Sequence, residues 1–153
     1  MGAVTLLTVL LPIDVLAASP RSDAGFQGTS SQRSGSLALP VGLRVSKSAR
    51  QVTRFDIQWT SECSSPTGRG SLDGLSVTLK RPIGRYGSFS DRTTLTRDLG
   101  DNQKGVLTVV LKGRFTKKTT ARGTFKVTIL IRNAAKQQVD TCDSATARWT
   151  VRD

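Results

Sequence analysis

Two segments in the C-terminal part of the chain decide the fold class: Leu107–Phe115 (LTVVLKGRF) and Ala121–Ile131 (ARGTFKVTILI). In both segments, apolar or small residues recur at every second position. Successive side chains of a β-strand point to opposite faces, so this spacing places these residues on one face. Thr116 to Thr120 separate the segments, a length typical of a hairpin loop. The predicted core residues of this hairpin are Leu107, Val109, Leu111, Phe125, Val127 and Ile129.

The same alternation continues outside this hairpin. It predicts further strands around Leu37–Val45, Phe55–Trp59, Leu75–Leu79 and Ala147–Val151. Pro40 has no backbone donor, so the first of these strands is expected at a sheet edge or beside a bulge. No stretch of the chain has a helical period. The pattern therefore predicts an all-β protein, an antiparallel β-sandwich or partly open barrel of about eight strands.

The domain organisation follows from the N-terminal residues. Residues 1–17 contain a short apolar run, VTLLTVLL, and end with Val15 and Ala17 at the positions that signal peptidase requires. The run is too short for a membrane helix, which needs about 20 apolar residues. We expect a signal peptide over residues 1–17, a flexible lead-in over 18–24 and a single domain over 25–153. Because no Lys or Arg precedes the apolar run, two alternatives stay open: a start further upstream, or a buried strand.

Export determines how the two cysteines are interpreted. Cys63 and Cys142 are the only cysteines of the chain, and two cysteines in an oxidising compartment usually pair. The long loop between them gives a disulfide a stabilising effect of ~4–5 kcal/mol in the chain-entropy model. We therefore predict a disulfide and a secreted, extracellular or wall-associated protein.

Several short strings occur together along the chain. They are Phe26-x-Gly28-Thr29, Cys63 after a Trp-bearing strand, Gly87-Ser88-Phe89, Gly113-Arg114-Phe115, Ala121-x-Gly123-Thr124, Cys142-Asp143-Ser144 and Trp149-Thr150. As a set, from Phe26 to Arg152, they resemble a recurring secreted domain of actinobacteria that has no established activity. Ala145 stands where that pattern has Gly. The resemblance implies secretion and a β-sandwich, and it transfers no catalytic or binding residue.

The charge of the chain is strongly unbalanced. It has 23 Lys and Arg against 11 Asp and Glu, a net charge of +12, and no histidine. Such a charge attracts polyanions, although it also serves simply to keep an exported domain soluble. Lack of histidine removes the commonest general base and zinc ligand. We therefore predict a non-enzymatic protein with no cofactor and no metal site.

The hairpin supplies the candidate binding residues. If its odd-numbered positions face the core, the basic side chains Lys112, Arg114, Arg122 and Lys126 face outward. Such a cluster is suited to phosphate or sulfate groups of a wall polymer, or to an acidic protein surface. The alternative is that these charges protect a sheet edge. Nucleic acid is a poor match, because aromatics form 5% of the chain and most are predicted in the core.

Three weaker signals remain. Tyr86 is the one aromatic expected to be exposed. The loop Asp98–Asn102 offers several oxygen ligands, but too few for calcium, and is interpreted as a polar turn. Glu62, Asp140 and Asp143 lie close to the two cysteines and define the alternative of a secreted hydrolase that uses carboxylates. A purely structural extracellular domain is the third hypothesis, and the oligomeric state is open.

Overall fold

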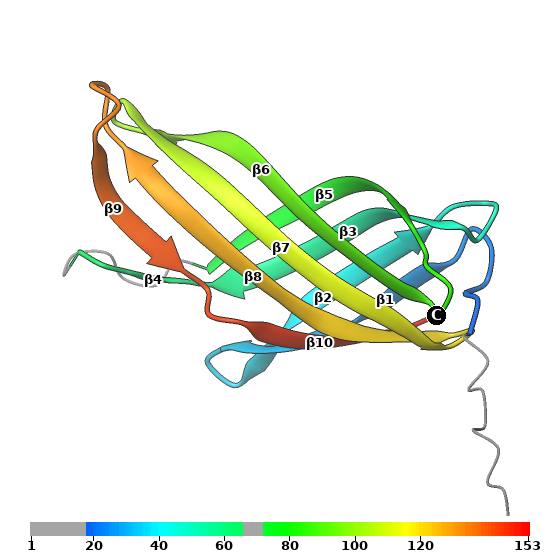
Figure 1. Cartoon of the computed structure of the whole chain (residues 1–153). Coiled ribbons are helices and arrows are strands. Elements are labelled where there is room, and N and C mark those ends of the chain that lie inside the picture. The colour runs from blue at the N-terminus through cyan, green and yellow to red at the C-terminus, as the bar shows by residue number, and fades with distance from the viewer. Residues whose placement is uncertain (1–17, 66–71) are drawn as a thin grey trace, which may run out of the picture.

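The computed structural model describes residues 18–65 and 72–153. Within these ranges the chain forms ten strands and no helix (Figure 1). The strands are β1 (Gly25–Ser34), β2 (Leu37–Val45), β3 (Gln51–Thr60), β4 (Glu62–Cys63), β5 (Leu72–Pro82), β6 (Ser88–Gly100), β7 (Gln103–Lys117), β8 (Thr120–Arg132), β9 (Gln138–Asp143) and β10 (Ala147–Arg152). The predicted all-β fold is confirmed.

All the strands belong to one antiparallel sheet that curls on itself. The order around the sheet is β6-β7-β8-β10-β1-β2-β3-β5. β8 carries two neighbours on one side: β10 pairs with residues 120–125 and β9 with residues 128–132. β4 extends the branch beyond β9. Because β5 and β6 are not joined by backbone pairing, the structure is the partly open barrel of the prediction.

Side chains bridge the opening between β5 and β6. Arg97 on β6 bonds Asp73 on β5 at 2.7 Å, and Arg81 on β5 bonds Asp91 on β6. The side chain of Asp91 is only 4% exposed, and it also accepts a hydrogen bond from the Thr93 hydroxyl. The two ion pairs therefore hold the free edges together.

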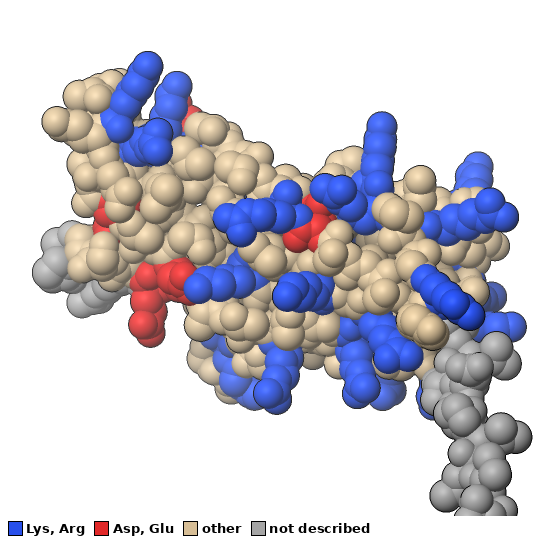
Figure 2. All heavy atoms as spheres, in the orientation of Figure 1, with Lys and Arg blue, Asp and Glu red and all other residues tan. Residues whose placement is uncertain are grey.

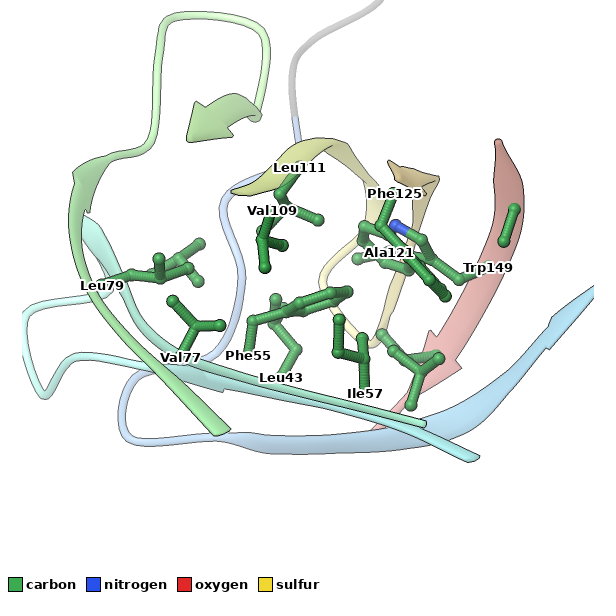
Figure 3. Close-up of a cluster of buried hydrophobic side chains, with 14 of the residues drawn as sticks. Leu43, Phe55, Ile57, Val77, Leu79, Val109, Leu111, Ala121, Phe125 and Trp149 are labelled. Atoms are coloured by element: carbon green, nitrogen blue, oxygen red, sulfur yellow. The ribbon is translucent and has the colours of Figure 1, made fainter. Parts of the chain in front are cut away.

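One hydrophobic core fills the inside of the curled sheet. Figure 3 shows Leu43, Phe55 and Val77, from the β2, β3 and β5 part, pointing toward Val109 and Phe125 of β7 and β8. The six predicted core residues of the hairpin are all buried in this cluster, so the two-residue period was interpreted correctly: Leu107, Val109, Leu111, Phe125, Val127 and Ile129.

Two inward glycines make room for a tryptophan. Phe89, Gly113, Gly123 and Trp149 form one row across β6, β7, β8 and β10. A Cβ on Gly113 would lie 2.3 Å from the Phe89 ring and 2.8 Å from the Trp149 ring, and one on Gly123 would lie 2.7 Å from Trp149. The two large rings therefore occupy the space above the glycines, which explains small residues at these core positions.

Cys63 and Cys142 form the predicted disulfide. They are opposite each other on β4 and β9, with 3.9 Å between their Cα atoms and a sequence separation of 79. The bond fixes the short strand β4, and with it one end of the loop that leads to β5.

Some local expectations differ from the structure. β2 is an interior strand, so the edge alternative for Pro40 is wrong; the β1–β2 pairing instead has an irregularity beside it. The β7–β8 connection is shorter than expected, because pairing continues to Lys117 and Thr120. In the β6–β7 turn, Asp101 and Asn102 have φ angles of 47° and 56°, the left-handed values that a two-residue hairpin turn requires.

The N-terminal residues divide into two parts. The expected signal peptide, residues 1–17, lies outside the described residues. In the expected lead-in, residues 18–24, the Arg21 amide bonds the Lys118 carbonyl and the Arg21 side chain bonds Asp153 at 2.9 Å. Ala24 is buried against the core. These contacts attach the segment to the barrel end that carries the β7–β8 turn.

Candidate functional site

The outer face of the β7–β8 hairpin carries the predicted basic residues. The odd-numbered positions of β7 are filled by core residues, so Lys112 and Arg114 point outward and are exposed. The same alternation exposes Arg122 on β8. Arg114 and Arg122 are directly opposite each other in the strand register. The structure thus brings three of the four predicted residues together.

A fourth basic side chain joins them from β10. Arg148 lies opposite Thr124, which in turn lies opposite Lys112. Lys112, Arg114, Arg122 and Arg148 line one open hollow of about 530 Å³ on the outer face. Thr124 and Thr150 supply hydroxyl groups to its walls, and Gly113 and Gly123 contribute to its lining. We call this feature the basic hollow and these four residues its cations.

The side chain of Arg114 is held by a neighbouring turn. Its Nε donates a hydrogen bond of 3.1 Å to the carbonyl oxygen of Tyr86. The two terminal nitrogens of the guanidinium then remain as donors. Tyr86 is 53% exposed, as expected, and the Arg85 guanidinium lies 5.7 Å from the centre of its ring.

In the part of the chain that the structure describes, the cations of the basic hollow have no acidic partner. Five ion pairs occur within residues 18–65 and 72–153, and none includes Lys112, Arg114, Arg122 or Arg148: Arg21–Asp153, Arg54–Asp56, Arg81–Asp91, Arg97–Asp73 and Lys126–Asp143. Figure 2 shows Lys and Arg side chains over much of this face, with a prominent acidic group near β4. The hollow is therefore a local concentration of uncompensated positive charge.

Lys126 lies on the same face but has a different role. Its Nζ bonds Oδ2 of Asp143 at 2.9 Å, and it is not part of the lining of the hollow. The pKa of Asp143 is lowered. Burial is the largest influence and raises this pKa, but the hydrogen bonds from Lys126 and the Ala145 amide and the charge of Lys126 outweigh it. Lys126 thus neutralises an acid rather than contributing a free charge.

Arg148 is the site residue that the sequence reasoning missed. Its position between the inward residues Ala147 and Trp149 shows that it faces outward. Its strand pairs with the first half of β8, and this long-range pairing places Arg148 across Thr124 from Lys112.

Two acids near the disulfide, Asp140 and Asp143, have lowered pKa values. Asp140 accepts hydrogen bonds from the hydroxyls of Ser64 at 2.7 Å and Ser65 at 2.6 Å. These two bonds, followed by bonds from backbone amides, hold the pKa of Asp140 well below its usual range. Glu62 lies opposite Asp143 in the register. The pKa of Asp143 is also lowered. A glycosidase needs one carboxyl group with a raised pKa as its acid, and the pKa values of Asp140 and Asp143 are shifted in the opposite direction.

Two groups of residues carry oxygen or sulfur atoms of the kind that ligate metal ions: the segment Asp98–Asn102 and the residues around the disulfide. In the segment Asp98–Asn102, Asp98 accepts a hydrogen bond of 2.9 Å from the Gly100 amide and so caps the turn. Cys63, Asp140 and Cys142 place their ligand atoms within 4.8 Å of one another. The two sulfurs are joined in the disulfide, and a metal site would need them as thiolates.

Comparisons with protein-family models, with curated protein sequences and with solved structures find no match to this chain. The resemblance to secreted actinobacterial domains therefore stays a prediction. Within the described part of the chain, no helix has the length and apolar character needed to cross a membrane.

Proposed function

We propose that this protein is a non-enzymatic, secreted or cell-surface module that binds an anionic polymer on its outer face. The observation that carries the proposal is the basic hollow, which Lys112, Arg114, Arg122 and Arg148 line. Among the residues that the structure describes, none of these four forms an ion pair. Like charges on a protein surface repel one another, and two like charges directly opposite across strands destabilise a sheet. A ligand with several negative charges relieves this repulsion.

The chemistry around the hollow favours a polymer without bases. Proteins that bind single-stranded nucleic acid stack successive bases on exposed aromatic rings. Here Trp59, Trp149 and the phenylalanines of the sheet are buried in the core. Tyr86 is the exposed aromatic near the hollow. A wall polymer with phosphate, sulfate or carboxylate groups therefore fits this surface better than nucleic acid, and an acidic protein surface is the alternative partner.

The proposed location outside the cytoplasm has one structural support. A disulfide between Cys63 and Cys142 is typical of an oxidising compartment. The apolar segment within residues 1–17 adds the expectation of a signal peptide. Detection of the protein in the culture medium or wall fraction, with an N-terminus at Ala18, tests this part of the proposal.

The binding proposal is tested by salt-dependent binding to an immobilised polyanion. The test variant is Arg114→Ser/Arg122→Ser, and the matched control is Arg44→Ser/Arg50→Ser. Arg44 and Arg50 are exposed and take part in none of the five ion pairs described. Both variants lose two positive charges, so any difference between them reports on position rather than net charge.

We expect the test variant to bind more weakly than the control. Each lost contact to an anionic group lowers the slope of log Kd against log salt by about one, so the double variant loses about two. Equal binding of the two variants at every salt concentration contradicts the proposal and favours a structural domain whose charge serves solubility. Melting curves of both variants confirm that each is folded.

A further inference from the structure

The pair Arg114–Arg122 has features that distinguish among anions. We propose that this pair binds a phosphate dianion, such as a phosphomonoester group carried on the polymer, in preference to a carboxylate or a sulfate. This inference rests on the proposed function and names the ligand chemistry of the same site. It follows from the charge, donor geometry and surroundings of the two arginines.

The charge of the pair matches a dianion. Arg114 and Arg122 occupy directly opposite positions, which places their Cβ atoms about 5 Å apart. A carboxylate or a sulfate ester brings one negative charge and leaves one guanidinium uncompensated. A phosphomonoester brings about 1.5–2 negative charges at neutral pH. Only this last group neutralises both arginines at once.

The donors of the pair also match three acceptor oxygens. Arg114 uses its Nε on the Tyr86 carbonyl, so its terminal nitrogens are the donors available to a ligand. Arg122 brings a second guanidinium, and Thr150 lies opposite Arg122 on the next strand. One guanidinium fork already satisfies the two oxygens of a carboxylate. A phosphomonoester has three strong acceptor oxygens, enough for both guanidinium groups.

The rest of the hollow extends the site along a polymer. Lys112 precedes Arg114 by two residues on β7 and also faces outward. Arg148 faces the hollow from β10. Thr124 lies between them in the register. These two cations therefore lie beside the arginine pair, where they neutralise the neighbouring anionic groups of the same chain.

The pH dependence of binding to this protein reports the protonation of a phosphate ligand. The chain has no histidine, the side chain that normally titrates between pH 5 and 8. The charged residues near the pair on β7, β10 and the β5–β6 turn are basic: Lys112, Lys117, Arg148, Arg152 and Arg85. Two acids lie just after the end of β10 and at the end of β9, and each is in an ion pair: Asp153 with Arg21 and Asp143 with Lys126. The second pKa of a phosphomonoester is near 6, so the ligand gains its second charge as the pH rises through that value. Binding to phosphate groups therefore strengthens between about pH 5 and about pH 7.5.

The experiment uses three supports that share one backbone: cellulose carrying phosphomonoester, sulfate or carboxymethyl groups at matched density. Three proteins are bound to each support at about pH 5 and at about pH 7.5. They are the wild type, the Arg114→Ser/Arg122→Ser variant and the Arg44→Ser/Arg50→Ser control. We expect wild-type protein to bind the phosphate support about tenfold more tightly than the carboxymethyl support at the higher pH. The preference shrinks at the lower pH, persists in the Arg44/Arg50 control and disappears in the Arg114/Arg122 variant.

The other outcomes separate this inference from the proposed function. If the Arg114/Arg122 variant loses binding by the same factor on all three supports, the hollow binds polyanions but does not select phosphate, and the inference is overturned. The inference is also overturned if the phosphate preference persists in that variant. If the variant equals the control on every support, the proposed function fails as well.

Discussion

Arg114 on β7 and Arg122 on β8 are directly opposite each other, both exposed, and neither forms one of the five ion pairs of the described residues. The contrast with Arg44 and Arg54 is instructive. Those two arginines are also opposite each other, but Arg54 bonds Asp56 at 2.8 Å. Sheet stability alone therefore does not account for the uncompensated pair, and ligand binding provides a reason for it.

The first prediction concerns the stability of that pair. Replacement Arg122→Thr removes the like-charge repulsion and introduces a residue that favours strands. We expect the free energy of unfolding to rise by about 0.2–1 kcal/mol while binding to a polyanion weakens. Urea unfolding at low salt measures the change. Arg44→Thr serves as the control, and a loss of stability in Arg122→Thr would show that its side chain makes a favourable contact.

The second prediction tests the close packing under the hollow. In Gly123→Ala, the added Cβ would lie 2.0 Å from the Lys112 carbonyl oxygen and 2.7 Å from the Trp149 ring. Overpacking of this kind costs about 1–3 kcal/mol, so we expect a clear decrease in melting temperature. Gly25→Ala is the matched control, since a Cβ there meets no atom within 4 Å. Equal melting temperatures would mean that the strands move apart easily at Gly123.

The third prediction concerns the disulfide. Cys63→Ala/Cys142→Ala opens a loop of 79 residues, and the expected loss of stability is about 2–5 kcal/mol. Wild-type protein should lose a similar amount in the presence of a reductant, whereas the double variant should be insensitive to it. Unfolding curves with and without reductant provide the comparison. Unchanged stability of the reduced wild-type protein contradicts the prediction.

The local pattern of the sequence accounts for most of the fold and for three of the four cations of the basic hollow. The two-residue period placed Phe125 and Val127 in the core, and the same period exposed Arg114 and Arg122. Which strand pairs with which is set by the packing of the whole sheet, and alternation in one segment carries no information about it. For that reason, the position of Arg148 across Thr124 from Lys112 and the ion pair of Lys126 could not be predicted.

The gap between β5 and β6 also has no signal in the local sequence. β5 and β6 are consecutive in the chain, and nothing in either segment marks that their backbones do not pair. In the structure their edges are linked through Asp73 and Arg97 and through Arg81 and Asp91. Ion pairs of this kind depend on side chains that come together only after the sheet has curled.

The last prediction concerns acid stability and the role of Asp140. Hydrogen bonds from Ser65 and Ser64 lower the pKa of Asp140 in the folded protein, whereas the unfolded chain has the ordinary value of about 3.9. A lowered folded-state pKa stabilises the fold above the unfolded value. This stabilisation is lost progressively as the pH falls below about 4 toward the folded-state value.

The variant Asp140→Asn keeps the size of the side chain but removes the titration. We expect its stability to depend less steeply on pH than that of the wild-type protein between about pH 4 and about pH 2, with a lower melting temperature at neutral pH. Asp101→Asn, at the exposed β6–β7 turn, is the control for loss of one acid. Melting temperatures across this range measure the difference. Parallel curves for the wild-type protein and Asp140→Asn would show that the serine hydroxyls do not hold this carboxylate in solution, because the protein would then gain nothing from keeping Asp140 ionised.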